Sequence, residues 1–145
     1  MVQINPYLNF DGNCEEAFNF YQKVFGGDVT INRFSEMPGD QPGPEADKVM
    51  HAELPLGDGQ KLFGSDRLSF MGATTLGDNV QISISPVSSE EGSRLFAGLA
   101  DGGEITQPYE KAFWGAEFGM CVDRFGVRWL VNYDEIGEDA RRAGG

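Results

Sequence analysis

The sequence predicts an α+β protein built from two copies, in tandem, of one strand–helix–strand–strand–strand module. The first observation is a repeat. An amphipathic stretch, a Gly-Gly pair, an acidic residue, a β-branched residue and Thr recur at a fixed offset, at 26–30 and 102–106. The same offset matches Leu8 with Ile84 in the strand expected before each helix. A period near half the chain length indicates two copies of one unit rather than a solenoid.

The first module is expected at 2–65. Apolar and polar residues alternate over 2–10, which is typical of a strand with one apolar face. Asn13 is the predicted N-cap of a helix at 14–25, which ends at Gly26-Gly27. The remaining segments are assigned by alternation and turn residues. They are a strand at 28–34, a Pro- and Gly-rich loop at 36–47, a strand at 48–56, a hairpin turn at 57–59 and a strand at 60–65.

The second module is expected at 78–134, after a connector at 66–77. Its helix at 88–101 has Ser88 or Ser89 as N-cap. Its predicted strands are 79–86, 104–110, 115–123 and 126–133. The last 11 or so residues have the composition of a frayed tail. Together the modules predict a single domain over 1–145.

Composition limits the classes of function. A net charge of −12 argues against nucleic-acid and anionic-membrane partners, because nothing would neutralise phosphates. The apolar runs are too short to span a bilayer, and the N-terminus has no signal-peptide pattern, so we expect a cytoplasmic protein. Cys14 and Cys121 are isolated in the sequence and are expected to be free thiols.

The two faces of the predicted strands differ. One helix covers one face of each sheet, and the apolar side chains belong there, including Met50, Ala52 and Leu54. The opposite face is polar for a central strand. We expect these side chains to line a cavity between two curled sheets, since buried polar groups need partners. A solvated face or a subunit contact is the alternative. The candidate cavity residues are Asn5, Tyr7, His51, Glu53, Gln81, Ser83, Trp114, Leu130 and Asn132.

Three stretches in this order resemble the PhnB-like branch of the glyoxalase/bleomycin resistance (vicinal oxygen chelate) superfamily. They are Asn-Pro-Tyr-Leu-Asn-Phe-Asp-Gly-Asn with Glu-Glu-Ala-Phe at 5–18, His-Ala-Glu-Leu at 51–54, and Asp-Arg-Phe-Gly-Val-Arg-Trp at 123–129. The resemblance covers about 2–134. It implies paired βαβββ modules, a pocket between curled mixed sheets, and a homodimer.

The resemblance also bears on metal binding. Metal-dependent members place four ligands on four strands, and those positions fall here on Asn5, Glu53, Gln81 and Leu130. Only Glu53 is a good hard-metal ligand, and Leu130 cannot bind a metal. We therefore predict no cofactor, although a divalent metal at Glu53 and His51 stays open. His51 and Glu53 are the candidate catalytic residues, as an acid–base pair, a weak metal site or a purely structural pair.

Other features carry weaker signals. The large rings of Phe113 and Trp114 would stack on a flat ligand, or would pack at an edge or dimer contact. Asp66-Arg67 and Asp123-Arg124 look like turn and surface charge pairs. Met37 to Pro44 would form a lid or a long surface loop. No glycine-rich nucleotide fingerprint and no nucleophile elbow is present in the sequence.

The sequence thus favours a small-molecule-binding protein of unknown ligand that lacks the family's full metal site. The runner-up is a metal-assisted lyase, isomerase or dioxygenase that uses Glu53 with His51. A dimeric interaction module without a ligand is the third possibility.

Overall fold

The computed structural model describes residues 2–38 and 43–134. The chain divides into two compact units, Met1–Thr75 and Leu76–Gly145, and each unit is described by itself. Parts of the predicted 36–47 loop and the whole C-terminal tail lie outside the described residues. That the two modules form one domain stays a prediction.

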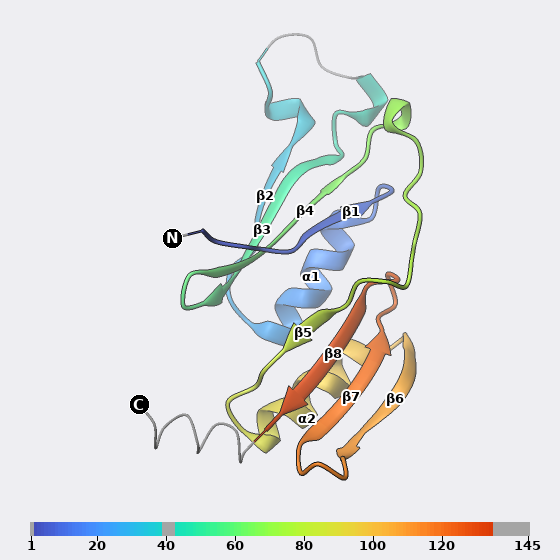
Figure 1. The fold of residues 1–145 in the computed structure, drawn as a ribbon. Coiled ribbons are helices and arrows are strands. Elements are labelled where there is room, and N and C mark those ends of the chain that lie inside the picture. The colour runs from blue at the N-terminus through green and yellow to red at the C-terminus, as the bar shows by residue number, and fades with distance from the viewer. Residues whose placement is uncertain (1, 39–42, 135–145) are drawn as a thin grey trace. The chain divides into compact units, whose positions relative to one another are not determined.

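The first unit is a four-stranded mixed sheet with one helix on one face (Figure 1). The strand order is β1-β4-β3-β2, with β1 parallel to β4 and the other neighbours antiparallel. This is the predicted βαβββ arrangement. Its elements are β1 (Tyr7–Phe10), α1 (Cys14–Phe25), β2 (Thr30–Arg33), β3 (Val49–Gly57) and β4 (Gln60–Asp66), with short 3₁₀ turns at Phe34–Glu36, Gly43–Glu45 and Ser69–Met71.

Helix α1 covers β3 and β4 with one apolar stripe. Ala17, Phe18 and Tyr21 are fully buried, at the i, i+1, i+4 spacing that places side chains on one helical face. Phe18 lies against a glycine of β4. A Cβ on Gly64 would come within 2.5 Å of Cε1 of the Phe18 ring. The sheet therefore approaches the helix closely because Gly64 has no side chain.

The first strand begins later than the sequence predicts. Residues 2–6 are not strand, and Val2 and Ile4 are exposed rather than packed under α1. The segment still lies along β4, because the backbone N–H of Phe63 donates to the carbonyl of Pro6. Alternating apolarity at 2–5 thus does not mean burial here, and α1 packs mainly on β3 and β4.

A register shift between β2 and β3 makes the predicted orientation of Met50 wrong. The shift falls between Asn32 and Arg33 of β2, which pair with His51 and Val49, so one extra residue is inserted in β3. As a result Val49 is buried and Met50, predicted to face the core, is only half-buried. Ala52 and Leu54 lie in the core as predicted.

The turn between β3 and β4 is the predicted hairpin. Gly57 pairs with Gln60, and both residues between them, Asp58 and Gly59, have positive φ. Two positive φ angles define the type I′ turn that Asp-Gly favours, and this turn matches the twist of the two strands. The pairing of β3 with β4 follows from it.

The second unit repeats the arrangement, with strand order β5-β8-β7-β6 and β5 parallel to β8 (Figure 1). Ser88 is the N-cap of its helix, where its Oγ accepts from the N–H of Glu91 at 3.1 Å. Trp129 and Val131 form the centre of the core beneath the helix. The elements are β5 (Ile82–Ile84), α2 (Ser89–Ala100), β6 (Glu104–Lys111), β7 (Glu117–Val122) and β8 (Arg128–Tyr133). Val80 lies within the strand predicted at 79–86, but it precedes β5 and is exposed.

The helices of the two units bury different parts of the sequence repeat. The repeat aligns Phe20 with Phe96, yet Phe20 is only half-buried while Phe96 is in the core. Phe18 is the packing counterpart of Phe96. Phe18 lies against Gly64 of β4, and a Cβ on Gly119 of β7 would meet the Phe96 ring at 2.8 Å. The repeat therefore predicts the helix ends better than the buried face.

Candidate functional site

Five side chains gather on the face of the first sheet that is turned away from α1. Successive residues of a strand point to opposite faces, so Ala52 and Leu54 turn toward α1 while His51 and Glu53 turn away. Register pairing then adds neighbours on the same face, because Phe63 pairs with both Tyr7 and Glu53. The set, called here the ring-and-charge face, consists of Tyr7, His51, Glu53, Lys61 and Phe63.

Three rings form the aromatic part of this face. The His51 ring centroid lies 5.3 Å from that of Phe63 and 5.9 Å from that of Tyr7, and Tyr7 and Phe63 are 6.1 Å apart. The planes are tilted by 37° to 38°. Tyr7 keeps 48% of its surface exposed, while His51 and Phe63 are half-buried, so the Tyr7 ring is the one most open to a partner from solvent.

The polar part runs from Tyr7 through His51 to Glu53. The Tyr7 hydroxyl lies 3.4 Å from Nδ1 of His51, and Nε2 of His51 lies 3.9 Å from Oε1 of Glu53. The second carboxylate oxygen, Oε2, is 3.4 Å from the Lys61 ammonium. Each oxygen of the Glu53 carboxylate therefore has a nitrogen nearby, and the Glu53 side chain is 29% exposed.

The side chain of Asn5 binds the backbone of β4 beside this face. Its side-chain oxygen accepts a hydrogen bond from the N–H of Lys61 at 3.1 Å. Asn5 thus fastens the segment before β1 to β4 and uses its oxygen there. This is a positioning contact for the chain that carries Lys61.

Sequence reasoning missed Lys61 and Phe63. The signal was present, since an Asp-Gly hairpin at 57–59 sets β4 antiparallel to β3 and places Phe63 opposite Glu53. The reach of the long Lys61 side chain to Glu53 is a matter of tertiary geometry.

The remaining predicted residues belong to the second unit. Ser83 pairs with Leu130, and Asn132 follows two residues later, so these three share the face turned away from α2. Trp114 lies in the turn between β6 and β7, half-exposed, with its ring 5.7 Å from that of Phe118. Gln81 is exposed and precedes β5. The expectation of a pocket between the modules stays a prediction.

The residues aligned with the family's metal ligands do not fit a metal ion. Leu130 offers only hydrocarbon, the Asn5 oxygen is used by Lys61, and the Glu53 carboxylate faces the Lys61 ammonium. A cation beside Glu53 would have to compete with that ammonium. Among the described residues, no group of three or more His, Cys, Asp and Glu could hold a metal ion.

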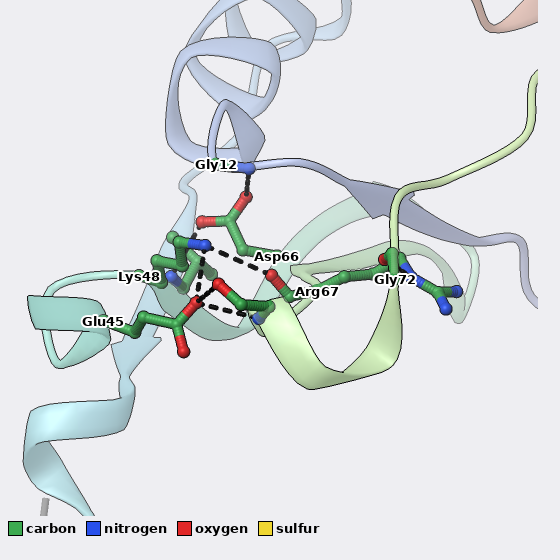
Figure 2. A network of polar contacts seen from close by, with 8 residues as sticks. Gly12, Glu45, Lys48, Asp66, Arg67 and Gly72 are labelled. Carbon is green, nitrogen blue, oxygen red and sulfur yellow. Dashed lines mark hydrogen bonds and ion pairs between the residues drawn. The ribbon is translucent and has the colours of Figure 1, made fainter. Parts of the chain in front are cut away.

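Two aspartates predicted at the surface are buried, and that prediction was wrong. Asp66 accepts from the backbone N–H of Gly12 at 3.0 Å (Figure 2). It also accepts from the backbone N–H groups of Cys14 at 3.0 Å and Val49 at 2.9 Å. Its bond from Cys14 satisfies the first N–H of α1, whereas the predicted N-cap Asn13 makes no side-chain capping bond. Asp123 accepts from the Trp129 indole and from two backbone N–H groups of its own turn. Asp66 and Asp123 are buried, and both oxygens of each carboxylate accept hydrogen bonds, which identifies them as structural residues.

A second polar network holds the loop before β3. Glu45 accepts from Lys48 and from the backbone and side chain of Ser69, and Arg67 donates to the carbonyl of Gly72 (Figure 2). The network ties the 3₁₀ turn at Gly43–Glu45 to the one at Ser69–Met71.

Both cysteines are buried. Burial raises the pKa of both thiols, that of Cys121 to about 11, so neither is a reactive thiolate.

Comparison with known proteins identifies the class. The family model described as 3-demethylubiquinone-9 3-methyltransferase matches residues 2–132. The chain belongs to this family, the PhnB-like branch of the glyoxalase/bleomycin resistance superfamily. The predicted resemblance is confirmed. No helix among the described residues is long and apolar enough to cross a bilayer.

Individual relatives cover nearly the whole chain. Protein PA1353 from Pseudomonas aeruginosa is 40% identical, with a TM-score of 0.82 over 92% of this chain and 98% of that one. A putative 3-demethylubiquinone-9 3-methyltransferase, PhnB protein, from Bacillus cereus is 28% identical, with a TM-score of 0.69 over 91% and 99%. Protein YjdN from Escherichia coli K12 is 30% identical over 90% of this chain and 95% of its own.

The fold class has support beyond the close relatives. A glyoxalase/bleomycin resistance protein from Albidiferax ferrireducens, only 13% identical, has a TM-score of 0.61 over 90% of this chain and 98% of that one. At this identity the likeness concerns the fold alone. It confirms the predicted α+β architecture of βαβββ modules.

Proposed function

We propose that this protein binds a small organic molecule on the ring-and-charge face of its first unit. The observation that carries the proposal is the convergence of three rings with a carboxylate and an ammonium on one sheet face. Rings supply flat apolar contact area, and a few fixed polar groups orient a ligand, which is the usual composition of a small-molecule site.

Binding fits the face better than metal-assisted chemistry does. His51 and Glu53 supply two donors to a metal, which is the observation in favour of an enzyme of the vicinal oxygen chelate type. Lys61 opposes it, because its ammonium lies 3.4 Å from Glu53 and would compete with a metal ion for that carboxylate. We therefore keep the metal-assisted lyase, isomerase or dioxygenase as the second candidate.

Methyl transfer, named in the description of the family, has no counterpart among these residues. The sequence holds no glycine-rich nucleotide fingerprint after a strand. Each described unit is a mixed sheet with one helix, unlike the doubly wound sheet that carries that fingerprint. We propose that the protein binds its ligand without methylating it. Homodimer assembly and a cytoplasmic location stay predictions.

The test uses the chain's single histidine. Ring signals of His51 in labelled protein report directly on the proposed face. We expect phenol, benzoate or benzylammonium to shift them in a saturable way. Glu53→Gln should weaken that binding several-fold with the melting temperature nearly unchanged, because Glu53 is partly solvated.

Glu110→Gln is the matched control, since Glu110 is an exposed strand glutamate of β6. This variant should bind the probes like the unmodified protein. Absence of any saturable shift at His51 with all three probes would overturn the proposal. A lower melting temperature for Glu53→Gln together with unchanged binding would make the face structural.

A further inference from the structure

The direction of the hydrogen bonds along the ring-and-charge face follows from Glu53. A carboxylate accepts hydrogen bonds and donates none, so the neutral His51 tautomer that suits this face carries its hydrogen on Nε2, the nitrogen nearest Glu53. In the neutral ring the other nitrogen, Nδ1, is then an acceptor. The Tyr7 hydroxyl, 3.4 Å away, can donate to it. In this tautomer Tyr7 donates to His51, and the N–H of His51 is directed toward Glu53 without reaching it.

The step from His51 to Glu53 contains a gap. Nε2 of His51 and Oε1 of Glu53 are 3.9 Å apart, beyond the roughly 2.7–3.2 Å of a direct hydrogen bond. No atom fits in line between them, but one oxygen beside the pair, about 2.8 Å from each, would bridge them. That atom must accept from Nε2–H and donate to Oε1.

Few chemical groups satisfy both demands. A hydroxyl group does, because it has one donor hydrogen and two lone pairs. An ether or carbonyl oxygen only accepts, and an ammonium only donates. Water has the same capacity as a hydroxyl, so a water molecule is the competitor for the position.

We propose that the position bridging Nε2 of His51 and Oε1 of Glu53 is a hydroxyl subsite that takes a phenolic or alcoholic O–H of the ligand. The inference rests on the proposed function and deepens it. The neighbouring Phe63 and Tyr7 rings would contact the carbon skeleton that bears the hydroxyl. Lys61 holds the far oxygen of Glu53, which leaves Oε1 for the ligand.

The experiment compares phenol with anisole, in which a methyl ether replaces the hydroxyl. The His51 ring nitrogens are followed by NMR in labelled protein, first without any probe. We expect the hydrogen on Nε2 in the free protein. We also expect phenol to bind about tenfold more tightly than anisole, since the ether oxygen has no hydrogen to donate to the charged Glu53 carboxylate.

The Glu53→Gln variant should shrink this preference, because a neutral amide oxygen is the weaker acceptor. Glu110→Gln should leave it intact. A hydrogen found on Nδ1 would overturn the inference. Equal binding of phenol and anisole would also overturn it, would indicate that water keeps the gap, and would leave the proposed function standing. If neither probe shifts His51, the hydroxyl subsite is overturned, and the proposed function fails with it when benzoate and benzylammonium also give no shift.

Discussion

The indole nitrogen of Trp129 donates to Oδ2 of Asp123 at 2.8 Å, and both residues are about 2–3% exposed. The other oxygen, Oδ1, accepts from the backbone N–H groups of Phe125 and Val127. One carboxylate thus fixes the turn between β7 and β8 and orients the largest side chain of the second core. The two cores depend on a buried aspartate each, Asp66 in the first unit and Asp123 in the second.

Asp123→Asn is expected to lower the free energy of unfolding by about 2–4 kcal/mol. The amide would bring N–H donors to a position where three donors already point, and charged hydrogen bonds contribute roughly 1.5–3 kcal/mol each. Urea unfolding followed by Trp fluorescence measures the loss. Asp101→Asn, at a side chain 78% exposed, is the control and should change little. Equal stability of the two variants would contradict the assignment.

Gly92 of α2 leaves space for the hydroxyl of Tyr109. A Cβ there would lie 2.2 Å from that oxygen, and the Tyr109 ring is held by stacking on Phe96 and by Glu117. Gly92→Ala should therefore be destabilising by up to about 2 kcal/mol, because overpacking of about 1–3 kcal/mol exceeds the roughly 1 kcal/mol gained in helix propensity.

The control for Gly92 is a double-mutant cycle. With Tyr109→Phe in place the obstructing oxygen is gone, so the same Gly92→Ala change should be neutral or stabilising. Thermal unfolding of the four proteins gives the coupling. Additive effects would show that the hydroxyl is not the obstacle.

Ionised Glu45 makes the stability of the first unit depend on pH in the acid range. Hydrogen bonds from the Ser69 side chain, from Lys48 and from the Ser69 backbone lower the pKa of Glu45 from 4.5 to about 2. A carboxyl whose folded pKa is depressed stabilises above its unfolded pKa, and this contribution is lost as pH falls from about 4.5 through 2. The amide shift of Ser69 should follow this change, with a midpoint near pH 2.

Glu45→Gln is the control for this titration, because an amide does not ionise in that range. The Ser69 amide of this variant should be insensitive to pH between 5 and 2. A midpoint near 4.5 in the unmodified protein would mean that the contacts of Figure 2 do not persist in solution.

Metal analysis tests the departure from the family's ligand set. Protein purified without a histidine tag is expected to carry far less than one transition-metal ion per chain, because Leu130 has no donor atom and the Lys61 ammonium would compete for Glu53. Elemental mass spectrometry measures the content. Stoichiometric zinc, nickel or manganese that Glu53→Ala removes, and Glu110→Ala retains, would overturn this prediction. His51 would then be the first ligand to examine.

The sequence by itself determined the order and type of the elements. Alternation, the Gly-Gly helix ends, Ser88 and the Asp58-Gly59 turn act between near neighbours in the chain, so they can be read without coordinates. The same alternation placed His51 and Glu53 on the face away from Ala52 and Leu54. These features belong to local backbone geometry.

Only the tertiary structure decided which polar residues are buried and which charges meet. Asp66 receives hydrogen bonds from Gly12, Cys14 and Val49, which are distant from it in the sequence. The extra residue in β3 turned Val49 inward, and Lys61 reached Glu53 across a strand pair. Burial and ion pairing depend on register and on packing between distant segments, and no periodicity within one segment encodes them.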